Sequence, residues 1–279
     1  MHHPSSSPSP SSITSGGSRA LIDLHKHHRG KKLEGTCVRF PREEYLEDYD
    51  DGDTENLEVL GPHNFFMHAR CPGASPTACP CGRYACHIDS MIVAVDGACP
   101  GNGTDRAVRS ACGVYFGPRD ASDGGQQNIA FQVPDVPGHP HTSQRAELHA
   151  AIAALSEAKK FATEGGQWHC KIPEQCASPC PIKHLIIKSD SAYLVNSMTD
   201  TISKWQENGW RTSKKTPVKN RDLWEQLTGH VAEYTALGVA VDFWLVPREE
   251  NAKADELANE GLDSGVMYTR NGLRLLPQH

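Results

Sequence analysis

A run of apolar residues that ends in a carboxylate does most to limit how this 279-residue chain can fold. The run covers residues 91–95 and is followed by Asp96 and Gly97. A continuous apolar run of this length is typical of a strand buried on both faces of a sheet. A carboxylate at the end of such a strand is costly to bury unless a cation meets it. The pattern therefore predicts a central strand that carries Asp96 to a site of positive charge.

Three further carboxylates have similar settings. Glu147 opens a helical pattern, Asp190 ends the short apolar strand predicted at 185–189, and Asp255 lies at the start of a helix. Single acids at strand ends are most often turn formers or helix caps. Four that converge, by contrast, would form a divalent-metal site, because Mg²⁺ prefers oxygen ligands. Paired ions at such a site clamp the attacking and leaving oxygens of a phosphodiester.

Short sequence words surround the four acids. They are Val95-Asp96-Gly97, Gln144-Arg145-Ala146-Glu147, Lys188-Ser189-Asp190-Ser191 and Ala254-Asp255-Glu256-Leu257-Ala258. In their wording and chain order they resemble the type 1 ribonuclease H family, with its Asp-Glu-Asp-Asp set, over about residues 90–262. The resemblance implies an α/β fold, a ribonuclease H-like mixed five-stranded sheet flanked by helices. Three antiparallel strands would come first and parallel strands would follow.

The resemblance also implies an activity, the endonucleolytic hydrolysis of the RNA strand of RNA/DNA hybrids. Two Mg²⁺ ions would serve, with Mn²⁺ as a substitute, and the products would carry 5′-phosphate and 3′-hydroxyl ends. We expect Asp96 to bridge both ions and Asp255 to join it at the ion that activates water. Glu147 and Asp190 would complete the ion at the leaving oxygen.

One departure from the family concerns the loop before the last acid, where many members carry a histidine. Residues 244–251 contain none. In some branches a Val-Pro-Arg loop stands there, so Arg248 is a candidate to assist catalysis, with a surface ion pair to Glu249 or Glu250 as the alternative. Because the loop histidine is missing, the chain could instead be a catalytically weak or inactive module that binds RNA/DNA hybrids. A zinc-dependent interaction protein is a third interpretation, but it does not explain the carboxylates.

A basic segment at 204–221 resembles the protrusion with which cellular members grip the DNA strand. It carries six Lys or Arg against one Glu, with two Trp between them, which suits phosphate contact and base stacking. The alternative is a solvated helical face that the Trp side chains anchor to the core. With positions carried over from the family, including Ser143 where an Asn is usual, the nucleic-acid candidates are Asn102, Thr142, Ser143, Gln144, Trp205, Trp210, Arg211, Thr212, Ser213 and Asn220.

Composition divides the chain into regions. We expect a disordered Ser/Pro-rich and then acidic region at 1–60, a Cys-rich segment at 61–89, a catalytic domain at 90–265 with a Cys-containing insertion at 163–184, and a tail at 266–279. The net charge of −6 does not exclude nucleic acid, because nine of the sixteen residues at 43–58 are acidic and local patches bind phosphate. The acidic stretch either covers the hybrid groove or is a solvated linker.

Ten cysteines are many for such an enzyme, and most fall in two groups, each just before a predicted strand. If the groups meet, they could hold structural zinc; disulfides and free thiols are the alternatives. The candidate zinc ligands are Cys71, Cys79, Cys81, Cys86, His87, Cys170, Cys176 and Cys180, with His169 and His184 beside the second group.

Neither a long apolar segment nor a secretory signal is recognisable in the sequence. We therefore expect an intracellular monomer in the nucleus, the cytoplasm or both, with RNA/DNA hybrid as its partner and no membrane contact. The basic run at 26–32 is either a nuclear signal or a solvated tail. The Ser-rich start leaves a mitochondrial address open.

Overall fold

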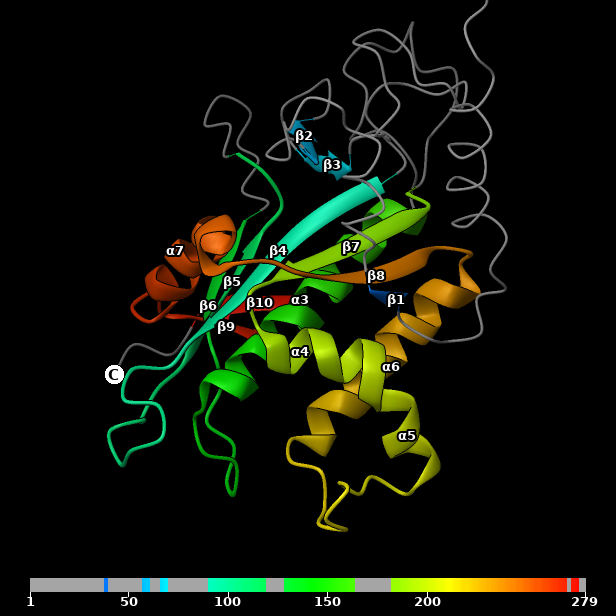
Figure 1. Cartoon of the computed structure of the whole chain (residues 1–279). Coiled ribbons are helices and arrows are strands. Elements are labelled where there is room, and N and C mark those ends of the chain that lie inside the picture. The colour runs from blue at the N-terminus through cyan, green and yellow to red at the C-terminus, as the bar shows by residue number, and fades with distance from the viewer. Residues whose placement is uncertain are drawn as a thin grey trace, which may run out of the picture.

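A mixed sheet forms the centre of the molecule. The structure is a computed structural model that describes residues 38–39, 57–60, 66–69, 90–118, 128–163, 182–269 and 272–275. Strand β4 (Ser90–Ala98) pairs antiparallel with β5 (Ala111–Tyr115) and parallel with β7 (His184–Ser189) (Figure 1). Strand β6 (Ile129–Gln132) follows beyond β5, and β8 (Ala240–Leu245) follows beyond β7. This order, β6-β5-β4-β7-β8, confirms the predicted five-stranded fold.

Five short strands that the sequence did not predict join this sheet. Strand β1 (Val38–Arg39) pairs with β8, while β2 (Glu58–Leu60) and β3 (Met67–Ala69) pair with each other and β3 with β4. At the other edge β9 (Val266–Thr269) pairs with β6, and β10 (Gly272–Leu275) pairs with β9. Strands β1 and β2 lie in the region at 1–60 that was predicted to precede the folded domain, and part of the predicted tail belongs to the sheet.

Helices cover both faces of the sheet. The long α3 (Ser143–Thr163) and α6 (Arg221–Ala236) pack on one face, and α7 (Ala252–Gly261) packs on the other (Figure 1). Small α4 (Ala192–Asn196) runs through a π-helical turn at Ser197–Thr201 into α5 (Ile202–Glu207). A 3₁₀ turn at Arg248–Asn251 leads into α7.

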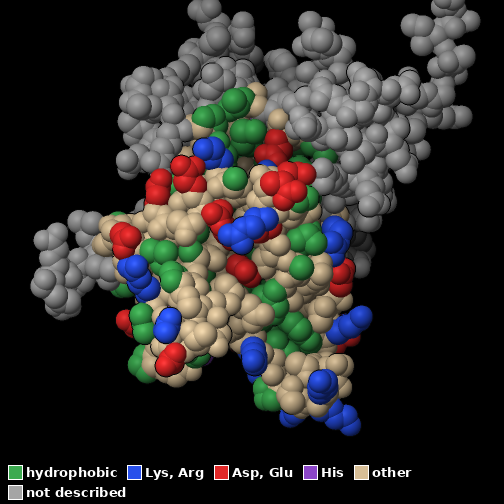
Figure 2. Space-filling view, turned by 60° about the vertical axis from the view of Figure 1, so that its left-hand side comes forward, with side chains coloured by type: hydrophobic (Ala, Val, Ile, Leu, Met, Phe, Trp, Pro, Cys, Tyr) green, Lys and Arg blue, Asp and Glu red, His purple; other side chains and the backbone are tan. Residues whose placement is uncertain are grey.

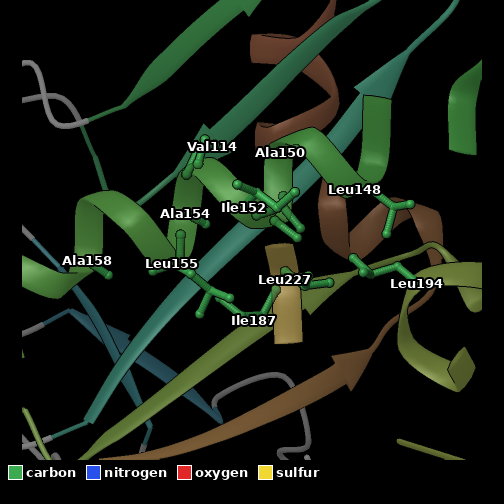
Figure 3. Close-up of a cluster of buried hydrophobic side chains, with 14 of the residues drawn as sticks. Val114, Leu148, Ala150, Ile152, Ala154, Leu155, Ala158, Ile187, Leu194 and Leu227 are labelled. Atoms are coloured by element: carbon green, nitrogen blue, oxygen red, sulfur yellow. The ribbon is translucent and has the colours of Figure 1, made fainter. Parts of the chain in front are cut away.

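The main core lies between α3 and the sheet. The large apolar residues Leu148, Ile152 and Leu155 of α3 recur at the spacing that places them on one face of a helix, and the small alanines between them are buried as well. Leu148, Ile152 and Leu155 are buried there with Val114 of β5 and Ile187 of β7 (Figure 3). This packing fixes α3, and with it Glu147 in its first turns, against the central strands.

A smaller apolar cluster lies on the opposite face of β4 and β7. Leu57 and Ala69, which belong to the segments around β2 and β3, pack there against Ile92 and Trp244. The amino-terminal segments therefore contribute to the fold of the domain whose start was predicted at residue 90.

Candidate active site

The four predicted carboxylates line one cleft of about 430 Å³. Asp96 lies near the end of β4 and Asp190 directly follows β7, and these two strands are parallel neighbours, so their ends meet. Glu147 comes from α3 and Asp255 from the first turn of α7. Side chains from two strands and from helices on opposite faces of the sheet therefore converge.

Two glycines allow the helices to come this close. A Cβ on Gly97 of β4 would lie 2.4 Å from the backbone nitrogen of Glu147. A Cβ on Gly113 of β5 would lie 2.2 Å from the backbone oxygen of Ala254, next to Asp255. Real Cβ contacts are not this short, so both close approaches depend on residues without side chains.

Burial and mutual repulsion disturb the ionisation of the acids. Burial, reinforced by the charge of Asp190, raises the pKa of Asp96 to about 6. Burial also raises the pKa of Glu147 to about 7, with a further contribution from Asp96 and against the hydrogen bond from Ser191. Both pKa values lie far above the usual range of carboxyl groups. Such a group of acids favours binding of a cation, because a cation relieves the repulsion among them.

Polar neighbours that the sequence analysis missed hold two of the carboxylates. The buried Asn251 side chain donates from Nδ2 to Asp190 Oδ1 at 2.9 Å and to the Val95 carbonyl oxygen at 3.1 Å. One amide therefore joins the end of β7 to β4 beside Asp96. The Ser191 hydroxyl donates to Glu147 Oε2 and also caps α4. A serine directly before a helical segment is a recognisable cap signal, but its second partner depends on the fold.

Asp255 is engaged on both of its oxygens. Arg248 Nη2 lies 2.5 Å from Oδ1, and Asn259 Nδ2 donates to Oδ2 at 3.0 Å. Arg248 therefore contacts the last predicted metal ligand. The spacing of Asn259, one helical turn after Asp255, was a signal in the sequence that could have identified it.

The donor set suits Mg²⁺, because all four predicted ligands are carboxylates. Within the part of the chain that the structure describes, no three His, Cys, Asp or Glu side chains form a ready coordination group. Several carboxylate oxygens are instead engaged by Asn251, Ser191, Asn259 and Arg248. These partners hold the carboxylates in place along the cleft.

The candidates for RNA contact lie beside this cleft. Asn102 Nδ2 donates to Ser143 Oγ at 2.9 Å, and Asn102 Oδ1 accepts from the Ser143 backbone nitrogen at 3.1 Å. Thr142 caps α3 through a bond from the Arg145 nitrogen, and Gln144 is exposed. The loop after β4 is thus joined to the start of α3, and Ser143 itself lines the cleft.

The basic segment between α5 and α6 lies at the lower end of the molecule in Figure 1, where Figure 2 shows Lys and Arg side chains gathered. Arg211 and Ser213 are exposed, and the hydroxyl of Thr212 bonds to that of Thr216. Asn220 directly precedes α6, has a positive φ of 57° and accepts a hydrogen bond from Arg145 at 3.3 Å.

The tryptophans of this segment are not arranged for base stacking. Trp210 is only 8% exposed and belongs to the core, with the Arg221 guanidinium 5.6 Å from its ring centre. Trp205 is half-buried, with its ring centre 5.8 Å from that of Trp224. Of the two roles that the sequence left open for Trp210, its burial favours the anchoring of the segment to the core. Both tryptophans thus fit the other interpretation of the sequence, in which the Trp side chains anchor the segment to the core.

Comparison with known proteins places this site in a family. The RNase H family model matches residues 89–263, which is more than half of the chain and contains all four carboxylates. The chain belongs to the ribonuclease H family. The expectation of a ribonuclease H enzyme is thereby confirmed at the level of the family.

Relatives of this ribonuclease H family member include enzymes from mammals and bacteria. Ribonuclease H1 of Mus musculus is 28% identical over 255 residues, which cover 90% of this chain and 73% of the mouse protein. Ribonuclease H of Pseudomonas paraeruginosa is 31% identical over 178 residues, 62% of this chain and 94% of the bacterial one. A crystal structure of LC11-RNase H1 in complex with RNA/DNA hybrid has 20% identity, covers 62% of this chain and 96% of that chain, and has a TM-score of 0.41.

Most candidate zinc ligands of this ribonuclease H family member fall outside the described residues. These are Cys71, Cys79, Cys81, Cys86, His87, His169, Cys170, Cys176 and Cys180. His184 is described, and its Nε2 lies 2.8 Å from Asp242 Oδ2. None of the helices that the structure describes combines the length and apolarity needed to cross a membrane.

Proposed function

We propose that this chain hydrolyses the RNA strand of RNA/DNA hybrids with two Mg²⁺ ions held by Asp96, Glu147, Asp190 and Asp255. The observation that carries the proposal is the convergence of these four carboxylates, from four separate elements, in one cleft. The relatives named ribonuclease H and ribonuclease H1 support the choice of reaction. Mn²⁺, which also accepts oxygen ligands, would substitute.

In the proposed reaction a water oxygen attacks phosphorus and the bond from phosphorus to O3′ breaks. One product receives the hydroxyl of water as a 5′-phosphate, and the other receives a proton as a 3′-hydroxyl. The bound ions would lower the pKa of the attacking water and stabilise the leaving oxygen. Asn251 holds Asp190, and Ser191 holds Glu147, so less reorganisation is needed when substrate binds.

Substrate recognition is proposed for two regions. Asn102, Ser143 and Gln144, which lie at or beside the start of α3, would contact 2′-hydroxyls of the RNA strand, and ribose hydroxyls distinguish RNA from DNA. The exposed cations between α5 and α6, among them Arg211, would contact phosphates of the DNA strand.

The deciding experiment is cleavage of an end-labelled RNA/DNA hybrid with Mg²⁺, with single-stranded and double-stranded RNA in parallel. We expect the hybrid alone to be cut, and Asp190→Asn to lower the rate at least about a thousandfold because it removes a ligand charge. Asp263→Asn, at a side chain that is 82% exposed, is the matched control and should cut at the normal rate. Tight hybrid binding without cleavage by the unmodified chain would favour the binding-module alternative instead.

A further inference from the structure

The contact between Arg248 and Asp255 joins a cation of the chain to a proposed metal ligand. Arg248 is 76% exposed and belongs to the 3₁₀ turn at Arg248–Asn251, so its side chain can leave without disturbing the core. Its guanidinium nevertheless lies 2.5 Å from Asp255 Oδ1 and lines the same cleft as the four acids. A long side chain on the rim of the site thus occupies one of its acidic oxygens.

The charge of Arg248 acts on more than one acid. Asp255 raises the pKa of Arg248 above its usual range, and Asp96 and Asp190 contribute to the same effect. The other oxygen of Asp255 is held by Asn259, a neutral donor. Asp255 therefore has partners on both oxygens, and only one of these partners is charged.

We propose that Arg248 competes with a divalent ion for Asp255, so that the Asp255 half of the site binds its ion more weakly than the half formed by Asp96, Glu147 and Asp190. This inference rests on the function proposed above and adds the order in which the site fills.

The physical basis is repulsion between two cations. Mg²⁺ binds oxygen at about 2.0–2.1 Å, so an ion on Oδ1 would lie at most about 4.6 Å from Arg248 Nη2 at the present contact distance of 2.5 Å. A doubly charged ion and a guanidinium this close repel each other strongly, even in a polar cleft. The ion can bind Asp255 tightly only after Arg248 has moved away.

A phosphate of the substrate provides Arg248 with another anion. Arginine pairs well with phosphate oxygens, because its planar fork matches their geometry. Hybrid binding would thus release Asp255 and strengthen ion binding there, and by linkage the ion would strengthen hybrid binding equally. The arginine of this loop therefore makes the second ion depend on the substrate.

The test is a titration of the full chain with MnCl₂ and with MgCl₂ in the absence of nucleic acid. Calorimetry gives the affinities, and electron paramagnetic resonance counts the Mn²⁺ ions bound. We expect Arg248→Ala to tighten the weaker binding step at least about tenfold, with the stronger step changed much less. Arg248→Lys keeps the charge and should retain weak binding at that step.

Arg109→Ala is the matched control, because Arg109 is also exposed and also pairs with an aspartate, Asp263, but does not line the cleft. It should leave both binding steps unchanged. Circular dichroism confirms that each variant is folded.

A weaker step of equal affinity in the unmodified chain and in Arg248→Ala would overturn the competition while leaving the proposed function intact. Absence of any bound ion in the unmodified chain, with or without hybrid, would overturn the metal mechanism itself. As a second readout, the Mg²⁺ concentration for half-maximal hybrid cleavage should fall in Arg248→Ala, whatever happens to the maximal rate.

Discussion

At the scale of single residues, Asp96 and Glu147 carry the electrostatic strain of the site. Both have raised pKa values in the folded protein, about 6 and about 7. In the unfolded chain, Asp and Glu side chains ionise at about pH 4. The unfolded state thus loses these protons at lower pH than the folded state, and the free energy of unfolding falls as pH rises from about 4 to about 7.

This sign gives a prediction for Asp96→Asn. In EDTA at about pH 8 the variant should have a free energy of unfolding about 1–3 kcal/mol higher than the unmodified chain, because one buried charge is gone. Near about pH 3.5, where Asp96 is protonated in the folded state, the difference should vanish. Urea unfolding at both pH values measures it, and Asp263→Asn is the exposed control. Equal free energies of unfolding for Asp96→Asn and the unmodified chain at the higher pH would show that the buried charge of Asp96 does not destabilise the folded protein.

The sequence predicted the four acids because each lies at a strand end or helix start that hydrophobic periodicity reveals. It did not predict Asn251 as the partner of Asp190, because the two are 61 positions apart and meet only in the folded chain. The role of Trp210 was also left undecided by the sequence, because a tryptophan between lysines could either stack on a base or pack in the core. Its exposure of only 8% in the folded chain favours the core.

At the scale of elements, the close approach of α3 to β4 and of α7 to β5 sets where Glu147 and Asp255 lie. Gly97→Ala or Gly113→Ala would force a methyl group into helix backbone at 2.4 Å or 2.2 Å. We expect each to lower the free energy of unfolding by about 1–3 kcal/mol or more, and to slow cleavage by displacing a carboxylate.

Gly229→Ala provides the contrast. Gly229 lies in α6, and among the described residues no neighbouring element comes within 4 Å of the place that an added methyl group would take. The change should therefore raise the free energy of unfolding by about 0.5–1 kcal/mol. Chemical denaturation of the three variants compares them directly. Destabilisation by Gly229→Ala as large as that by Gly97→Ala would show that helix contact is not the cause.

The central elements were predictable because each has its own periodicity, as in the buried face of α3. Strands β1, β2 and β3 have only two or three residues and carry no such pattern. Strand β1 pairs with β8, about 200 residues further along the chain, and among the described strands β2 is joined to the main sheet only through β3, which pairs with β4. Long-range pairing of this kind decides short strands more than local preference does.

At the scale of the whole molecule, an ion pair ties an amino-terminal segment to the catalytic sheet. Lys188 of β7 is 7% exposed, its ammonium group bonds to Glu58 of β2, and it lies 5.6 Å from the ring centre of Trp244. Glu58 is the last of the nine acids at 43–58, and the other eight fall outside the described residues. At this position the acidic stretch neutralises a buried lysine of the domain.

Glu58→Gln should therefore lower the free energy of unfolding by about 1–3 kcal/mol, because it leaves a buried charge without its partner. Adding Lys188→Met to that variant should restore most of the loss, since the unpaired charge is then removed. Thermal and urea unfolding of the two single variants and the double variant complete the cycle. Additive losses in the double variant would mean that the two side chains do not depend on each other.

The pairing of β1 with β8 also affects how copies of the molecule behave in crowded solution. Val38 and Arg39 lie opposite Asp242 and Phe243, the middle of the six-residue β8. A strand from another copy that approached β8 would find its central hydrogen-bonding positions already occupied and only short stretches on either side. β-aggregates grow when chains pair along long uninterrupted strand edges. The two residues of β1 in this position therefore protect the molecule from edge-to-edge pairing with another copy.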